Sequence, residues 1–531
     1  MISLCPGVVG SSGPLAREHP LSRSRTRFTL ASGIMALTMA GCGMMPVNLT
    51  NRTSSGVEAR QVETPSWVQD AIFYQIFPER FANGNPRNDP KDVRPWGSKP
   101  EYFNFMGGDL EGVLARLGYL RSLGVNAIYL NPIFTSSSNH KYNTSNYFEV
   151  DPHFGGDAVF DRLLKTAHAM GMKVVLDGVF NHTSDEHPFF QDCIKKGPAS
   201  PYWNWYTIYS YPVVTSPRPN YNSWWGFGTL PQWRAAADRR VQDYIFSIEE
   251  YWLKKGIDGW RLDVPNEIDN DDFWREFRVR ARKINPQAYI VGEIWEDASR
   301  WLKGDQFDSV MNYELRTSVC NFLGNQQWNV DQFDWALAGL RNKYDVRITN
   351  AMFNILSSHD VPRFRSVAGG DRRKTLLAHT FQMTYPGAPV IYYGDEIGME
   401  GEKDPDNRRC FPEDSRDGDG EMLAHTKQLV ALRRAHPALR GGSFVSTQRH
   451  NDMNCYAYQR VLGNDRVTVV LNNAEAVRNW NPSVGSGVPD GTNLVDGLSG
   501  KRFTVKDGRV QVHLAPKQGL VLVDASSATR R

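Results

Sequence analysis

The chain has 531 residues and a mass of 60.2 kDa, which exceeds one ordinary domain but suits a large barrel with a smaller domain attached. Its 61 Lys and Arg side chains nearly balance its 58 Asp and Glu side chains, so charge gives no reason to expect a nucleic acid as partner. The six cysteines have neither the spacing of a metal site nor that of a paired disulfide framework.

Residues 1–42 are typical of an export signal. Three arginines within 23–27 precede the apolar run 28–40, which is too short for a good membrane span. Small residues then lead into Cys42, which resembles a bacterial lipoprotein signal cleaved before a lipidated cysteine; ordinary secretion with cleavage nearby is the alternative. Residues 43–66 are polar and suit a tether. We expect an exported protein, either a lipoprotein of the cell envelope or periplasmic or extracellular, with membrane contact only through Cys42.

From residue 67 onward, short apolar strands alternate with helical segments. The helical period is clear at 110–123, 160–170 and 241–254. The expected strands are 71–77, 127–130, 173–180, 256–264, 289–294, 309–312, 352–356 and 389–393. Eight such strands separated by helices predict an α/β fold of the (β/α)8 TIM-barrel type rather than a doubly wound sheet.

Two further parts are expected beside the barrel, which would occupy residues 67–436. A segment of about 183–230, rich in Trp, Tyr, Pro and Ser, follows the third strand and predicts an inserted subdomain over the site. Beyond it, short alternating strands such as 454–458 and 466–471 predict a separate C-terminal antiparallel β-domain at 437–525.

The predicted fourth strand, 256–264, places two charged residues on one face. Trp260 and Leu262 alternate with Arg261 and Asp263, and successive strand side chains point to opposite faces. A charged pair on an inward face is costly to bury. The pair is either a structural ion pair or a carboxylate nucleophile that its arginine neighbour keeps ionised.

Ionisable side chains stand at the ends of four predicted strands. In a parallel barrel the chemistry lies at the carboxyl ends of the strands. Those ends carry Asp177, His182, Arg261, Asp263, Glu293, His359 and Asp360. Each alone has a structural interpretation as a cap, a turn or a helix start. Four such ends around one rim predict a catalytic site.

These segments resemble the characteristic regions of the α-amylase family, glycoside hydrolase family 13. The resemblance runs from about residue 67 to the chain end and includes 387–396. It implies that Asp263 is the nucleophile, Glu293 the general acid/base and Asp360 the carboxylate that stabilises the transition state. By the same resemblance, the reacting sugar would be bound by Tyr147, His140, His182, Arg261 and His359, although Asn143 and Asn146 stand where the family has aspartates.

The chemistry of acetal cleavage calls for such carboxyl groups independently. Its oxocarbenium-like transition state needs an anion below the ring and a proton donor above the leaving oxygen. Asp263 must be ionised, which Arg261 favours, and Glu293 must carry a proton at the start. Asp360 adds negative charge where positive charge develops. Retention of configuration, with two carboxyl groups about 5 Å apart, is implied by the family.

Within the family, the resemblance is greatest to neopullulanases, cyclomaltodextrinases and maltogenic amylases. The segments that carry it are 139–142, 291–295, 304–308 with 311–313, and 404–409. It implies that Asp404 and Arg408 hold the next sugar outward from the cleavage point and that Trp295 faces the leaving side. Two features differ from that subgroup: the barrel follows the tether without an N-terminal β-domain, and 230–234 departs from the usual sequence. A broader α-amylase activity is therefore expected.

The expected activity is hydrolysis of α-1,4-glucosidic bonds in starch-derived maltodextrins, with cyclodextrins and pullulan as further substrates. The partner would be an α-glucan or maltooligosaccharide; the sequence does not predict an oligomeric state. One alternative is a transglycosylase on the same scaffold. Another is an inactive glycan-binding protein, which would have lost Asp263 or Glu293, and both are present.

An oxygen-rich loop predicts a calcium site. Hard oxygen ligands suit Ca²⁺, although Asn-Gly-Asn-Pro is also an ordinary turn. Similarity to the calcium loop of the same subgroup favours the metal, and Asn85 stands where relatives often have Asp. The predicted ligands are Asn83, Asn85, Asn88, Asp89, Gly107 and Asp109.

Overall fold

The computed structural model describes residues 62–414 and 417–528. The predicted signal at 1–42, with Cys42, and most of the predicted tether at 43–66 lie outside these residues. Within the described part, no helix combines the length and the apolar character that crossing a bilayer requires.

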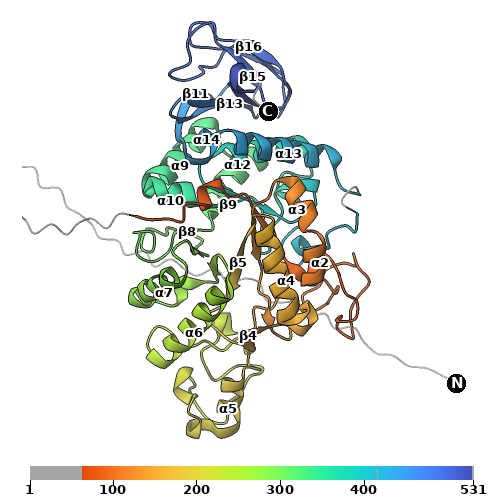
Figure 1. Cartoon of the computed structure of the whole chain (residues 1–531), viewed down its shortest axis with the longest axis vertical. Coiled ribbons are helices and arrows are strands. Elements are labelled where there is room, and N and C mark those ends of the chain that lie inside the picture. The colour runs from red at the N-terminus through yellow and green to blue at the C-terminus, as the bar shows by residue number, and fades with distance from the viewer. Residues whose placement is uncertain (1–61, 415–416, 529–531) are drawn as a thin grey trace, which may run out of the picture. The chain divides into compact units, whose positions relative to one another are not determined.

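Eight parallel strands form the centre of the fold (Figure 1). In sheet order they are β8 (Ser309–Val310), β7 (Tyr289–Gly292), β6 (Gly259–Leu262), β5 (Lys173–Gly178), β2 (Ala127–Leu130), β1 (Phe73–Ile76), β10 (Ala388–Tyr392) and β9 (Phe353–Ile355). The two ends of this order meet, because Met311 after β8 pairs in parallel with Phe353 of β9. The predicted (β/α)8 barrel is confirmed, and each predicted strand has an observed counterpart.

Helices surround these strands (Figure 1). They are α1 (Pro78–Phe81), α2 (Leu110–Ala115), α3 (Leu117–Leu123), α4 (Gly156–Ala169), α6 (Arg239–Lys255), α7 (Asp271–Ile284), α8 (Tyr313–Val319), α9 (Val330–Lys343), α10 (Val346–Ala351), α11 (Phe364–Val367), α12 (Arg372–Thr384), α13 (Gly420–Ala435) and α14 (Pro437–Gly441). Local sequence sets their ends: the Asp238 side chain accepts a hydrogen bond from the first turn of α6, and Gly256 ends that helix at φ 109°. β6 begins three residues later, at Gly259.

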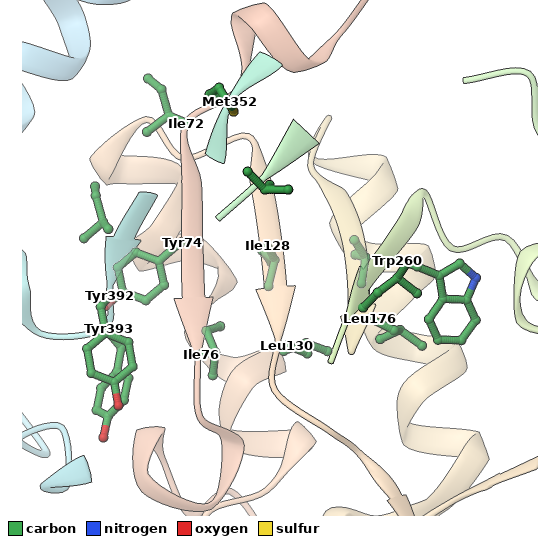
Figure 2. Close-up of a cluster of buried hydrophobic side chains, with 14 of the residues drawn as sticks. Ile72, Tyr74, Ile76, Ile128, Leu130, Leu176, Trp260, Met352, Tyr392 and Tyr393 are labelled. Atoms are coloured by element: carbon green, nitrogen blue, oxygen red, sulfur yellow. The ribbon is translucent and has the colours of Figure 1, made fainter. Parts of the chain in front are cut away.

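Alternation along the strands divides the apolar side chains between two cores. Ile76 of β1 lies beside Leu130 of β2, and Tyr74 of β1 lies beside Tyr392 of β10, in the core that the helices cover (Figure 2). The opposite faces of the strands fill the barrel interior with Phe73, Tyr129, Val175, Tyr289, Val291, Phe353 and Val390. Both faces of each strand are therefore buried, as parallel sheets require.

The interior changes from apolar to polar toward the carboxyl ends of the strands. The next inward positions after the apolar layer are Gln75 on β1, Asp177 on β5 and Arg261 on β6, and all three are buried. Asp177 and Arg261 are register partners. Ionised groups are expensive to bury unless they are paired, so this layer places a compact polar cluster at the mouth of the barrel.

The segment between β5 and α6 is held close to this mouth. It contains α5 (Pro188–Lys196) and short 3-10 turns, and it packs aromatic rings such as Phe189 and Tyr202, whose centroids are 4.0 Å apart. An isolated bridge joins His182 to Gln232, so the start and the end of the segment meet beside the carboxyl end of β5. A short hairpin, β3 (Phe134–Thr135) and β4 (Asn146–Val150), precedes it in the chain.

The C-terminal part is antiparallel, as predicted. In sheet order its main strands are β11 (Ser443–His450), β12 (Cys455–Leu462), β13 (Asp465–Asn472), β18 (Gly519–Asp524), β15 (Asn493–Asp496) and β16 (Arg502–Thr504). A second pair joins β14 (Arg478–Trp480) to β17 (Val512–Leu514), and α15 (Ala525–Ala528) follows. Arg460 of β12 donates to the carbonyls of Thr384 and Leu439, which ties this sheet to the barrel helices. The described cysteines, Cys193, Cys320, Cys410 and Cys455, are free thiols.

Candidate active site

Arg261 is the centre of a buried cluster of carboxyl groups, which we call the Arg261 cluster: Arg261, Asp177, Asp263 and Glu293. Nη1 of Arg261 donates to Asp177 Oδ1 at 3.0 Å and to Asp263 Oδ1 at 2.8 Å. Nη2 lies 2.9 Å from Glu293 Oε2. Asp263 and Glu293 follow the last residues of β6 and β7 directly, so adjacent strands bring them to one guanidinium.

Opposing electrostatic effects act on the pKa values of the carboxyl groups in the Arg261 cluster. Burial raises the pKa of Asp263, the Arg261 charge opposes that rise, and the charges of Glu293 and Asp177 add to it. Burial also raises the pKa of Asp177, against Arg261 and two tyrosine hydroxyls. Such strongly interacting groups lose protons as a set. One cation among three carboxyl groups favours a set that keeps a proton, which suits a site that needs one ionised and one protonated carboxyl.

Besides Arg261, two donors hold the carboxyl group of Glu293. The Val264 N–H donates to Oε2 at 3.2 Å, and Trp295 Nε1 donates to Oε1 at 3.2 Å. Val264 has φ 35° and ψ 50°, a left-handed conformation that is strained for a β-branched residue. The chain therefore turns sharply just after Asp263, and this turn aims a backbone donor at Glu293.

Asp360 lies at the side of the cluster that faces Arg408. Its Oδ2 is 3.2 Å from His359 Nε2, and its Oδ1 is 3.7 Å from Arg408 Nη2. Burial raises the pKa of Asp360 to about 7, Glu293 adds to the rise and Arg408 opposes it. Arg408 Nη2 is also 3.7 Å from Asp404 Oδ2. Arg408 thus links Asp360 to Asp404 along the rim.

Replacing Arg408 with Gln should move the acid limb of the pH profile to higher pH. The role predicted for Asp360, stabilisation of positive charge, requires its ionised form, so kcat/KM is expected to fall as the pH drops below about 7. Loss of the Arg408 charge removes an influence that lowers the pKa of Asp360, so the limb moves upward. Profiles of kcat/KM against pH measure this, with Arg409→Gln, whose partner is Asp406, as the matched control. An acid limb at the same pH in Arg408→Gln and the wild type would contradict the assignment of this limb to Asp360.

Of Tyr142 and Tyr147, it is Tyr142 that borders the cluster. The Tyr142 hydroxyl donates to Asp177 Oδ2 at 2.9 Å and lies 2.5 Å from His359 Nε2, and the two rings are parallel. Tyr147 is fully buried in the core, and its hydroxyl donates to the His182 carbonyl. The prediction that Tyr147 contacts the sugar was therefore wrong, because the alternation of β4 directs its ring into the core.

The predicted histidines lie close to Tyr142. His182 Nε2 is 3.2 Å from the Tyr142 carbonyl, and the His140 ring centroid is 5.9 Å from that of Tyr142. Burial lowers the pKa of His140 to about 3 and that of His182 to about 4. Burial also lowers the pKa of His359 well below its usual range. All three imidazoles are thus neutral near pH 7 and add no positive charge to the site.

The sequence did not single out Glu267, whose charge interacts with that of Glu293, or Trp224, whose ring centroid is 5.6 Å from that of His182. Glu267 accepts a hydrogen bond from Trp224 Nε1 at 3.2 Å, and burial raises its pKa. Trp295 is about half exposed and stacks on Tyr313 with ring centroids 3.9 Å apart. The only sequence signals for Glu267 and Trp224 were the aromatic content of the insertion and an acid shortly after Asp263.

Residues of the predicted calcium loop form hydrogen bonds to Asp109, which caps the start of α2. Asp109 accepts hydrogen bonds from the backbone N–H groups of Gly84 and Asn85, at 3.0 Å each, and from that of Gly112 at 2.7 Å. The Asn88 side chain donates to it as well, at 3.1 Å. The Asp109 oxygens therefore have several protein donors, and Asp109 organises the loop.

The same loop contains buried oxygens without a protein partner. Asn83 Nδ2 donates to both oxygens of Asp89, at 2.9 and 3.0 Å, while the Oδ1 atoms of Asn83 and Asn88 have no hydrogen-bond partner. Gly107 lies against this group, since a Cβ there would come within 2.6 Å of Asp89 Oδ1. Within the described residues, no group of three or more His, Cys, Asp or Glu could hold a metal. Amide oxygens beside one carboxylate nevertheless fit a hard cation.

Comparisons with known proteins agree with this geometry. Residues 75–427 match the family model described as alpha amylase, catalytic domain. The chain is 44% identical over 469 residues to a cyclomaltodextrinase from Geobacillus thermopakistaniensis, covering 88% of this chain and 78% of that protein. It is 43% identical over 464 residues to neopullulanase 2 from Thermoactinomyces vulgaris, covering 86% and 78%. A solved structure of cyclic α-maltosyl-(1→6)-maltose hydrolase from Arthrobacter globiformis, ligand-free, matches with a TM-score of 0.80 and 35% identity over 87% of this chain and 99% of that chain.

Proposed function

Because this chain belongs to the α-amylase family of glycoside hydrolases, we propose that it hydrolyses α-1,4-glucosidic bonds in maltodextrins and cyclodextrins with retention of configuration. The observation that carries the proposal is the Arg261 cluster, in which neighbouring nitrogens of one guanidinium hold Asp263 at 2.8 Å and Glu293 at 2.9 Å. Such closeness suits a retaining pair, about 5–5.5 Å apart, better than an inverting pair, which is about 6.5–9.5 Å apart to leave room for water.

In the first step, Asp263 attacks the anomeric carbon while Glu293 gives its proton to the glycosidic oxygen of the leaving sugar. The C–O bond to that sugar breaks, and an ester bond to Asp263 forms. In the second step, ionised Glu293 takes a proton from water, which attacks the same carbon and releases Asp263. Asp360 stabilises the positive charge that develops in both steps.

The position of Glu293 determines on which side of the cleaved bond the leaving sugar lies. Glu293 protonates the leaving oxygen and is bonded to Trp295, so the leaving sugar lies on the Trp295 side. The retained sugars then lie on the other side, along Asp360, Arg408 and Asp404. An acceptor sugar stacked on Trp295 would turn hydrolysis into transglycosylation, which is the alternative outcome on this scaffold.

The test is incubation of the protein with soluble starch, pullulan, β-cyclodextrin and maltotriose, followed by chromatography of the products. The matched relatives include a cyclomaltodextrinase and a neopullulanase, so these substrates separate the specificities. We expect shorter maltooligosaccharides from starch and ring opening of β-cyclodextrin. Products longer than the substrate would favour transglycosylation, and absence of any product from all four would refute the proposed function.

We further propose that the loop at 83–89 holds a calcium ion through the oxygens of Asn83, Asn88 and Asp89. Its support is the pair of buried, unpartnered Oδ1 atoms beside a carboxylate. When bound, the ion would supply charge that holds the loop against α2. The predicted backbone ligand Gly107 and the second acid Asp109 would support the loop around it.

Removal of calcium should lower the thermal stability of the protein. A ligand that binds only the folded state stabilises it by about 2.7 kcal/mol at 100 times its Kd, so excess EGTA should lower the unfolding midpoint and added Ca²⁺ should restore it. Asp89→Asn should reduce the effect, and Asp92→Asn, an exposed acid nearby, should not. Calorimetric titration gives a readout other than activity. A thermal unfolding midpoint that neither EGTA nor Ca²⁺ changes would contradict the proposed calcium site.

For location, we propose export to the cell envelope with a lipid anchor at Cys42. Its support is the sequence pattern of residues 1–42. A metabolic acyl label that appears on the wild type but not on Cys42→Ala is the expected result. Equal labelling of both proteins, or of neither, would refute the anchor.

A further inference from the structure

Tyr102 and Phe103 form an exposed aromatic pair on the rim of the barrel. Their side chains are 55% and 86% exposed, and their ring centroids are 6.4 Å apart. Neither residue belongs to the Arg261 cluster or to the calcium loop. Exposed rings are common one at a time, but two neighbouring rings beside a binding site point to a contact surface.

Buried polar side chains hold the backbone beneath these rings. Asn139 Nδ2 donates to the carbonyl of Tyr102 at 3.0 Å and to that of Asn104 at 2.7 Å. Arg80 Nη2 donates to the Asn104 carbonyl at 2.6 Å and to its Oδ1 at 3.0 Å. Because Arg80 and Asn139 are buried, the pair is presented by a fixed loop, and fixing the contact residues in advance lowers the entropy cost of binding.

The same loop is continuous with the glycone side of the site. The Tyr102 hydroxyl donates to the Asp404 carbonyl at 3.2 Å, and Arg408 connects Asp404 to Asp360. Asn139, which anchors Tyr102, directly precedes His140 beside Tyr142. Moving outward from the reacting sugar, the chain therefore presents Asp360, then Asp404 with Arg408, and then the aromatic pair.

We propose that Tyr102 and Phe103 are a stacking platform for the third glucose unit on the glycone side of a linear α-1,4-glucan. This inference rests on the proposed function and adds a determinant of chain length to it. Glucose rings have apolar faces that pack on aromatic rings, while their hydroxyl groups remain in water. The platform gives a preference for substrates with three or more glucose units before the cleaved bond.

The experiment compares p-nitrophenyl α-maltoside with p-nitrophenyl α-maltotrioside, which place two and three glucose units before the released nitrophenol. In Phe103→Ala, the ratio of kcat/KM for the longer substrate to that for the shorter is expected to fall about twofold to tenfold, mainly through KM. The shorter substrate should be unaffected. Phe103→Trp should keep the wild-type ratio, and Trp335→Ala, which removes another ring that is 80% exposed, serves as the matched control.

The outcomes are distinguishable. An unchanged ratio in Phe103→Ala, or an equal loss on both substrates, would overturn the inference while hydrolysis stands. A wild type inactive on both substrates would refute the proposed function and this inference together. Sedimentation of the wild type and of Phe103→Ala tests whether the two rings instead contact a second copy of the chain. A dimer that is lost in Phe103→Ala, together with an unchanged kcat/KM ratio, would overturn the proposed stacking platform. Equal thermal midpoints exclude misfolding as the cause of a fallen ratio.

Discussion

Replacing Asp263 with Asn is expected to lower kcat on every hydrolysed substrate by about 10,000-fold or more. The amide has nearly the same shape but neither the negative charge nor the nucleophilic oxygen that forms the ester with the sugar. Arg261 keeps its contacts with Asp177 and Glu293 in this variant, so the fold should survive. Steady-state rates on soluble starch and β-cyclodextrin, with the thermal midpoint, provide the measurement.

The matched control for this variant is Asp269→Asn. Asp269 lies shortly after the same strand, but its side chain is 76% exposed and its ion pair is with Arg300 on the surface. Its substitution should leave kcat within about twofold of the wild type, because surface pairs contribute only about 0–1 kcal/mol. If Asp263→Asn kept most of the activity, Asp263 would not be the nucleophile.

The part of the site that follows from local pattern could be predicted from the sequence. Arg261 and Asp263 are two positions apart on a strand, so they share a face whatever the rest of the chain does. The barrel itself follows from the order of strands and helices, and the carboxyl ends of its strands must meet at one rim. These rules are enough to bring Asp263, Glu293 and Asp360 together.

Residues whose place depends on packing could not be chosen from sequence alone. Tyr142 and Tyr147 are close in the chain and chemically identical, and only the start of β4 at Asn146 decides which ring enters the core. The Tyr102 hydroxyl meets Asp404 across 302 residues of chain. No local periodicity reports such a contact, because it depends on how two loops pack after the barrel has closed.

Replacing Arg261 with Met is expected to destabilise the protein by about 3–5 kcal/mol near neutral pH, because it leaves buried carboxylates without their cation. Asp177 has no exposed surface in its side chain and Asp263 little, so water cannot replace the guanidinium. Activity should be lost as well, since Asp263 and Glu293 lose the group that positions both. Arg261→Lys keeps the charge but not the planar set of donors, and an intermediate loss of stability is expected.

The pH dependence separates lost charge pairing from lost packing. Removing Arg261 raises the pKa values of Asp177 and Asp263 further, since its charge opposes the rise that burial causes. A carboxyl whose pKa is higher in the folded than in the unfolded state favours folding at low pH, and this contribution is lost as the pH rises through the folded-state pKa. The difference in the free energy of unfolding between Arg261→Met and the wild type should therefore be smaller at about pH 5 than at about pH 8. Urea unfolding followed by tryptophan fluorescence measures it, with surface Arg300→Met as control. A difference as large at the lower pH would assign the loss to packing and refute the electrostatic role of Arg261.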